Sequence, residues 1–176
     1  MKTDFVIADE HGRELFKEYA TKQDWYKYIK ESKNEKARWD ISYWSGSTMI
    51  IGEIKVRESY DSTSFVEWDY EAKKHTALVE LKDQMQEKYP KKTIEIQYIN
   101  IFKDEAIKIW TTTNIHNQQQ PVWNKRPSTT YGKTEMVDKL NYKCSLENEA
   151  LRSHLYEVIS EPRIEDGEDE NDNLPF

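Results

Sequence analysis

A short apolar segment in the first third of the chain contains the charges with the clearest chemical potential. In residues 50–56 (IIGEIKV), Glu53 and Lys55 are two positions apart. Side chains alternate between the faces of a strand, so both charges would lie on one face while Ile54 and Val56 turn into the core. Burying charges in an apolar strand is costly unless they have a partner or a task. Glu53 and Lys55 are therefore candidate site residues.

A second carboxylate precedes this pair in a way that brings it close. Asp40 is separated from Glu53 by the twelve residues 41–52, and Ser45-Gly46-Ser47 marks a turn between the two extended runs. A hairpin with that turn folds the runs against each other, so Asp40 and Glu53 can approach. Two carboxylates beside an ammonium form a site that a hard divalent cation would stabilise.

The triplet Glu-x-Lys alone carries little information in this chain. It recurs at positions 31–33, 71–73 and 80–82, in a connector or in helical patterns, where the charges are expected to be solvated. Only Glu53 and Lys55 combine an apolar strand with an acid on the preceding strand. A surface salt bridge on a sheet edge is the plain alternative for this pair.

The first half of the chain predicts the elements that would position these residues. We expect a break at His11-Gly12, a helix over 14–30, a charged connector over 31–37, and strands over 38–44 and 48–57. Alternation of Ile54 and Val56 with charged residues supports the second strand. A long helix is predicted over 66–89, because apolar residues recur there every three or four positions until Pro90.

The second half adds more sheet. Strands are predicted over 93–102, 106–110 and 139–146, with a loop over 111–135 and a helix over 148–159. Helices and strands in this order predict an α/β or α+β fold, with a central sheet flanked by helices. In the loop, residues 123–130 (WNKRPSTT) combine an aromatic ring, two bases and hydroxyls, which could contact a phosphate backbone or form a plain loop.

Charge and composition divide the chain into a body and a tail. Of the net charge of −7, residues 161–176 contribute −6 (seven acids, one Arg) and residues 1–160 contribute −1 (26 acids, 25 bases). We predict one domain over 1–160 and a disordered acidic tail over 161–176. A near-neutral body argues against strong non-specific nucleic-acid binding but leaves room for a local basic groove.

Other features exclude several classes of protein. No stretch approaches 18 apolar residues and the first ten residues lack an apolar core, so we expect neither membrane association nor a secretory signal. Cys144 is the only cysteine, which excludes an internal disulfide and indicates a reducing cytoplasm. The four histidines show no ligand spacing, which argues against zinc, and five glycines leave no phosphate-binding loop.

Asp40, followed after twelve residues by Glu53-Ile54-Lys55, resembles the motif of the PD-(D/E)xK nuclease superfamily. The context is most similar to that of archaeal-type Holliday junction resolvases and small nucleases of viruses and bacteriophages, over roughly residues 14–110. The resemblance implies a restriction-endonuclease-like core. Two features depart from the pattern: Trp39 replaces the usual Pro, and the body lacks the basic excess of resolvases.

What the resemblance implies about chemistry is specific. Asp40, Glu53 and the carbonyl of Ile54 would hold Mg²⁺ or Mn²⁺, and Lys55 would position water or offset phosphate charge. A helix acid would join them, Glu18 by preference and Glu14 as second choice, and Lys73 or Lys74 would lie near the metal. The resemblance implies a DNA endonuclease or exonuclease in phage replication, recombination or DNA processing. Resolvases of this kind are usually dimers, so it also implies a homodimer. The expected location is the cytoplasm, or the host cytoplasm if the protein is viral.

The tail supports a different class of function. Residues 165–176 (EDGEDENDNLPF) are similar to the acidic tip of bacterial single-stranded-DNA-binding proteins, which recruits replication and repair enzymes. That similarity implies a protein partner held through Leu174, Pro175 and Phe176. The alternative to a nuclease is thus a catalytically inactive adaptor or structural protein on the same fold, and a solvated acidic tail remains the plain alternative for the tip.

Overall fold

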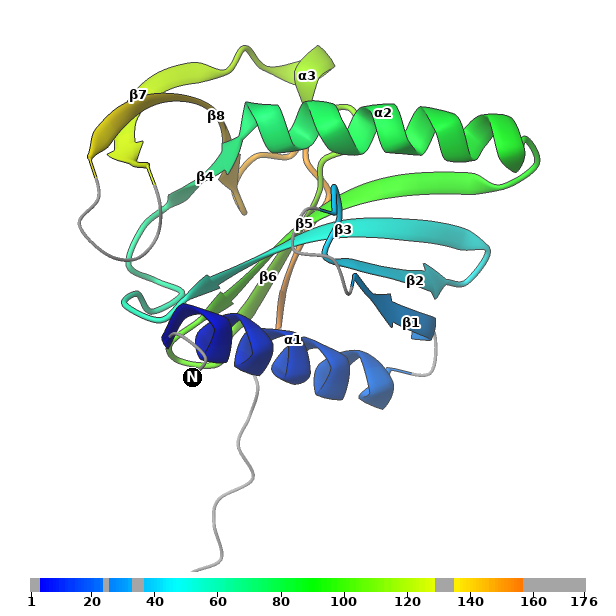
Figure 1. Ribbon diagram of the computed structural model, residues 1–176, viewed down its shortest axis with the longest axis horizontal. Helices are drawn as coiled ribbons and strands as arrows, with labels where there is room; N and C mark the ends of the chain where they lie inside the picture. Colours follow the sequence, from blue (N-terminus) through cyan, green and yellow to red (C-terminus); the bar gives the residue numbers. More distant parts are fainter. Residues whose placement is uncertain (1–3, 24–25, 33–36, 129–134, 157–176) are drawn as a thin grey trace, which may run out of the picture.

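The computed structural model describes residues 4–23, 26–32, 37–128 and 135–156. The chain forms an α+β structure in which helices flank a mixed sheet (Figure 1). In chain order its elements are α1 (Asp4–Lys22), β1 (Tyr26–Glu31), β2 (Ile41–Ser45), β3 (Thr48–Arg57), β4 (Glu67–Glu71), α2 (Ala72–Lys88), β5 (Thr93–Phe102), β6 (Ile107–Thr111), α3 (Ile115–Gln118), β7 (Val122–Pro127), β8 (Met136–Ser145) and β9 (Ser153–Tyr156).

The main sheet has six strands in the order β1-β2-β3-β5-β6-β9. β3 and β5 pair in parallel and the other neighbours are antiparallel. The predicted hairpin is present, with Gly46 at a φ of 59° in its turn. Parallel neighbours need a long crossover, and β4 with α2 provides it between β3 and β5. The sequence predicted the bounds of β3 and β5 correctly.

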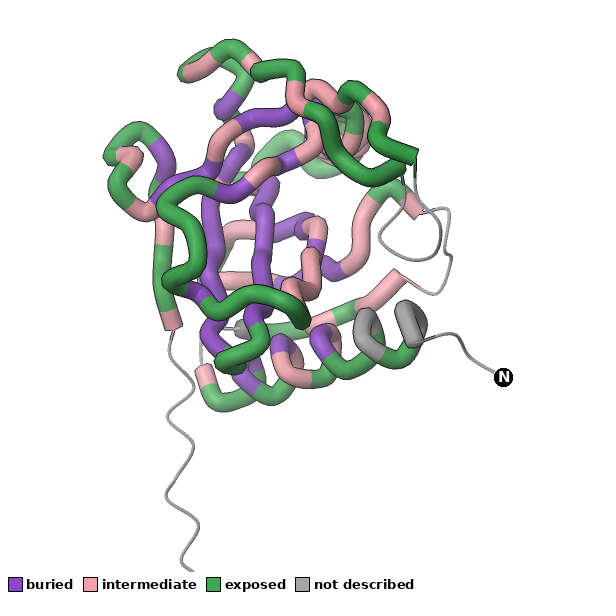
Figure 2. The backbone as a smooth tube through the Cα atoms, turned by 90° about the vertical axis from the view of Figure 1, so that its left-hand side faces the viewer, coloured by how far each residue is buried: buried purple, intermediate pink, exposed green. Residues whose placement is uncertain are grey.

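The two faces of this sheet bury different sides of β3. Ile50 and Ile54 pack with Phe16 of α1 in one cluster of buried residues. Ile51 packs with Leu78 of α2 in another, on the opposite face. In Figure 2 the central strands form a buried layer above α1. Glu53 and Lys55 share the α2 face with Ile51, as the alternation predicted.

A second, three-stranded sheet has the order β4-β8-β7. Trp68 and Tyr70 of β4 alternate with acids and turn inward, where Tyr70 stacks on Tyr98 with ring centroids 4.5 Å apart. Tyr98 in turn stacks on Trp110 of β6. These rings join the second sheet to the α2 face of the main sheet. The sequence had assigned all of β4 to the helix predicted over 66–89 and β7 to a loop, and both assignments were wrong.

The predicted helix over 14–30 was also wrong in both bounds. Helix α1 starts ten residues earlier than predicted and runs through Gly12, while residues 26–31 form β1. A Cβ at Gly12 would lie 2.3 Å from Val56 Cγ2. Gly12 therefore marks a close approach of helix and sheet rather than a break. β1 shows no clean alternation because its pairing shifts between Lys27 and Lys30, where Tyr28 has a φ of 57°.

The C-terminal part of the described chain differs from prediction in one more place. Residues 153–156, expected in a helix, form β9 and pair with β6 at the sheet edge. The last predicted strand, over 139–146, corresponds to the longer β8. The acidic tail at 161–176, including residues 174–176, lies outside the described residues. Among the described residues no helix has the length and apolar character needed to cross a membrane.

Candidate active site

Asp40 lies one residue before β2, and its backbone is still hydrogen-bonded to the chain on either side of that strand. Its N–H donates to the carbonyl of Gly52 and its carbonyl accepts from the N–H of Ser32, each at 2.9 Å. Its carboxylate Oδ2 accepts the N–H of Ile54 at 2.8 Å. The Asp40 carboxylate thus accepts the N–H of Ile54 in place of a backbone carbonyl of β2, just beyond the last paired residues of β2 and β3.

The same geometry directs the carbonyl of Ile54. Gly52 turns its carbonyl toward the β2 side, and backbone groups two residues apart along a strand point the same way. The N–H of Ile54 confirms this direction through its bond to Asp40. We infer that the Ile54 carbonyl points to the side on which the Asp40 carboxylate lies. The two carboxylates do come together, because a hydrogen bond to Asp40 is among the causes that raise the pKa of Glu53.

Glu53 is the acid at this site whose pKa is shifted from its ordinary value. Its side chain is only 12% exposed, and Lys74 of α2 contacts both carboxylate oxygens, at 3.3 and 3.4 Å. Burial, the charge of Asp40 and a hydrogen bond to Asp40 raise the pKa of Glu53 to about 7, against the lowering effect of Lys74. Glu53 and Asp40 therefore come together as the sequence predicted, and Lys74 joins them as a predicted helix cation.

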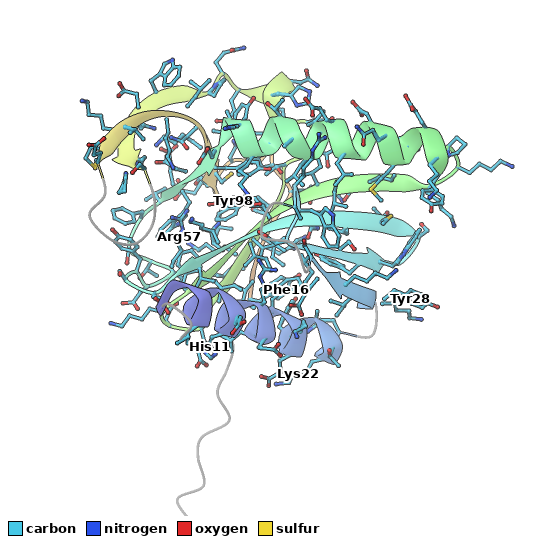
Figure 3. All side chains as sticks on the ribbon, viewed as in Figure 1. His11, Phe16, Lys22, Tyr28, Arg57 and Tyr98 are labelled. Atoms are coloured by element: carbon cyan, nitrogen blue, oxygen red, sulfur yellow. The ribbon has the colours of Figure 1, made fainter. Side chains whose placement is uncertain are left out.

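Lys55 lies two residues beyond Glu53 on the same face of β3. Burial, followed by the nearby charge of Arg57, lowers the pKa of Lys55 below its usual range. Arg57 itself donates to Asn100 and to the Tyr98 hydroxyl, each at 2.7 Å (Figure 3). The α2 face of β3 therefore presents an acid followed by two bases, at alternate positions of the strand.

Arg13 is a site residue that sequence reasoning missed. Its guanidinium contacts Asp40 Oδ1 at 3.2 Å and the Ser32 carbonyl at 3.4 Å, and both Arg13 and Asp40 side chains are largely buried. The available signal was the apolar pattern of Phe16 and Tyr19, which sets the inner face of α1. Because that helix was expected to begin only at residue 14, Arg13 was left outside it.

The other predicted helix residues do not join the carboxylates. Glu18 is 64% exposed and pairs with Lys22 at 3.0 Å, and Glu14 is 68% exposed and pairs with Lys17 at 2.5 Å. Lys73 is exposed, unlike its neighbour Lys74. In the part of the chain that the structure describes, no group of three or more His, Cys, Asp or Glu side chains could hold a metal.

Cys144 and two histidines, which were judged unimportant for chemistry, have clear structural places. Cys144 is fully buried in the second core, as expected for a structural thiol, and burial raises its pKa. The histidines are not all scattered: His75 Nε2 lies 3.0 Å from His116 Nδ1, which joins α2 to α3. Burial, with a smaller effect of His116, lowers the pKa of His75 to about 4, so the His75 ring is neutral near pH 7.

The oxygen groups at this site fit one class of cation. Mg²⁺ prefers oxygen ligands and usually binds through one or two carboxylates, keeping several waters for substrate to replace. Asp40, Glu53 and the Ile54 carbonyl could supply that set. Burial is the main cause that raises the pKa of Glu53, and the charge of Asp40 is the second. A zinc site would need nitrogen or sulfur ligands, which this group lacks.

Comparison of the chain with models of protein families, with curated proteins and with solved structures found no match in any of the three.

Proposed function

We propose that this protein is a Mg²⁺- or Mn²⁺-dependent nuclease of the PD-(D/E)xK type that hydrolyses phosphodiester bonds in DNA. The observation that carries the proposal is the meeting of two largely buried carboxylates, Asp40 and Glu53, where β2 begins beside β3. The order of elements around them supports a restriction-endonuclease-like core: a helix, three antiparallel strands, the short β4, a second helix and a strand parallel to β3.

Each residue has a task in this proposal. Asp40, Glu53 and the Ile54 carbonyl would hold the cation, which would supply a bound water of lowered pKa and positive charge beside the phosphate. Lys55 lies on the same face and positions the attacking water or offsets developing charge on the phosphoryl oxygens. Lys74 orients Glu53 through its ion pair. Arg13, whose guanidinium lies 3.2 Å from Asp40 Oδ1, would share that carboxylate with the cation.

The ion pairs also favour a second candidate, a catalytically inactive adaptor on the same fold. Arg13 pairs with Asp40 and Lys74 pairs with Glu53, so each carboxylate already has a cationic partner. A site neutralised in this way is stable without metal. In that case the fold serves binding rather than hydrolysis, and metal neither binds nor promotes cleavage.

Cleavage by the full chain separates the two candidates. We expect Mg²⁺- or Mn²⁺-dependent cleavage of at least one substrate among single-stranded, duplex, flap and junction DNA. Asp40→Asn and Glu53→Gln should each lower the rate by at least about a hundredfold, because several kcal/mol of charge stabilisation is lost. Glu95→Gln is the matched control, since Glu95 is a largely buried strand acid paired with Arg152, away from the site.

Two results would exclude the nuclease. One is a folded chain that leaves every DNA substrate and RNA intact in both metals. The other is cleavage that persists equally in Asp40→Asn and Glu95→Gln, which would place the activity elsewhere or in a contaminant.

A further inference from the structure

The second sheet extends beyond the core as a two-stranded ribbon. β4 pairs with residues 141–145 of β8, whereas β7 pairs with residues 136–141. Residues 122–127 and 136–141, here called the β7–β8 ribbon, therefore continue past the end of β4. Figure 1 shows this ribbon as a curved extension on one side of the molecule, away from the far end of α2.

The base of the ribbon lies beside the candidate active site. Lys139 Nζ contacts Glu71 Oε2 at 3.3 Å, and Glu71 directly precedes α2. Lys139 is also one of the cations that lower the pKa of Lys55, and Lys74 in the first turn of α2 contacts Glu53. A substrate bound at Glu53 and Lys55 would therefore pass close to the ribbon.

Ion pairs to one acid hold the ribbon in its curved shape. Asp69 of β4 accepts from Lys143 at 2.5 Å and from Arg126 near the outer end of β7. These two cations lower the pKa of Asp69 against the effect of its burial. The clamp bends the ribbon back toward β4, so the ribbon is a positioned arm.

The opposite face of the ribbon is exposed and carries a different set of side chains. Trp123 is 66% exposed, and Lys125, two residues further on, is exposed on the same face. Residues 122–145 hold five bases and two acids, or +3, within a body of net charge −1. An exposed indole on a basic edge strand is unusual for a surface that contacts only water.

We propose that the β7–β8 ribbon enters the major groove of duplex DNA whose backbone lies at the candidate active site. The major groove is about 12 Å wide and admits a two-stranded β-ribbon. The free part of the ribbon is about 17–20 Å long, at about 3.3 Å per residue, enough to reach into the groove. Lys125 contacts phosphate, and Trp123 contacts the apolar base edges. This inference rests on the proposed function and adds the form of the substrate.

Binding without cleavage tests the proposal. Labelled duplex and single-stranded oligonucleotides are titrated with Asp40→Asn protein in EDTA, and affinity is followed by fluorescence anisotropy over a range of salt. Adding Trp123→Ala and Lys125→Ala should weaken duplex binding roughly tenfold and lower the salt slope by about 1. Single-strand binding should change much less, because a single strand has no groove.

A matched pair of substitutions controls for general surface effects. Lys27→Ala with Tyr28→Ala removes one exposed lysine and one aromatic side chain that is 76% exposed, from an edge strand of the other sheet. This pair should leave duplex affinity unchanged. Unfolding curves for both double variants should coincide with that of Asp40→Asn, since none of the four side chains is buried.

Several results would overturn the ribbon proposal. These are no duplex binding, duplex affinity that is equal in both double variants, or equal losses for duplex and single strand. A dimer that dissociates with Trp123→Ala would instead identify the surface as an interface between copies of the chain. The proposed function fails differently: ribbon-dependent duplex binding without any cleavage by wild-type protein would contradict the nuclease alone.

Discussion

Glu53 links the stability of the protein to pH. Its pKa is about 7 in the folded chain against an ordinary value of 4.5, with burial as the main cause and Asp40 as the second. Between these values the folded chain holds a proton that the unfolded chain has lost. The contribution of that proton to the free energy of unfolding is fully present below pH 4.5. It is lost as pH rises toward 7, by at most on the order of 3 kcal/mol.

Chemical denaturation of wild type and Glu53→Gln between pH 4 and 8 measures this effect. The free energy of unfolding of wild type, minus that of Glu53→Gln, should fall as pH rises and level off above pH 7. Taking the difference cancels the contributions of other titrating groups to the free energy of unfolding. One of these is His75, whose lowered pKa makes the folded chain more stable as pH rises. A difference that is flat with pH would show that the pKa of Glu53 is the same in the folded and the unfolded chain.

In the proposed metal site, Arg13 would compete with the cation for Asp40. Replacing Arg13 by Gln removes the guanidinium that lies 3.2 Å from Asp40 Oδ1 and leaves more negative charge at the site. We expect a lower melting temperature without metal and a larger increase on adding Mg²⁺ than in wild type, because metal binds the folded state selectively.

Arg38→Gln is the control for this experiment, because Arg38 pairs with Glu80 on the surface of α2. Its metal-induced increase should equal that of wild type. Equal increases for Arg13→Gln and wild type would mean that Arg13 and the cation do not share Asp40.

The contact of helix α1 with β3 depends on Gly12. A Cβ at this position would lie 2.3 Å from Val56 Cγ2. Alanine favours a helix interior over glycine by about 1 kcal/mol, yet overpacking typically costs about 1–3 kcal/mol. We therefore expect Gly12→Ala to lower the free energy of unfolding in spite of its better helix propensity.

A double-mutant cycle attributes that loss to the contact. Val56→Ala removes the methyl group that would clash, so Gly12→Ala should cost less in the Val56→Ala background than alone. The same cost in both backgrounds would show that Gly12 is required by another part of the helix.

At the level of elements, the prediction of secondary structure failed where a strand pattern is directly followed by a helix pattern. Trp68 and Tyr70 alternate with acids, as in a strand, but α2 follows without a break and its pattern of Leu78 and Met85 extended the predicted helix backward. β7 was missed because it is exposed along most of its length. Edge strands like β7 and β9 form only when they pair with a neighbouring strand, and the local sequence does not show which strand that neighbour is.

For the molecule as a whole, the hairpin made the core of the site predictable. Asp40, Glu53 and Lys55 are positioned by two strands and one turn, all close in sequence, and the observed register of Ile41 with Gly52 places them as expected. Arg13 and Lys74 come from separate helices, and only Lys74 was among the candidates. Glu18 was chosen from its helix alone, without knowledge of which face of α1 meets the sheet.

The acidic tail, residues 161–176, leads to a further prediction about the whole molecule. Deleting residues 161–176 changes the net charge from −7 to −1, since the tail contributes −6. For a docking peptide, we expect deletion and Phe176→Ala to abolish capture of a partner with a basic-rimmed apolar pocket, with unchanged nuclease activity and strong salt dependence.

Two other results for the tail have defined meanings. Raised DNA affinity after deletion would indicate that the acids compete with phosphate for the protein's own surface. If Phe176→Ala alters neither partner capture nor DNA affinity, the docking proposal is wrong and the tail is a solvated end.

Calorimetric titration of the full chain with Mg²⁺, repeated with Mn²⁺, tests most directly whether Asp40 and Glu53 form a metal site. We predict that wild type and Glu95→Gln bind one cation per chain at this site, more tightly as pH rises toward 7 and Glu53 gives up its proton. Asp40→Asn and Glu53→Gln should each lose that binding. Equal cation binding by all four proteins, or none by wild type, would contradict a metal-dependent active site at this position.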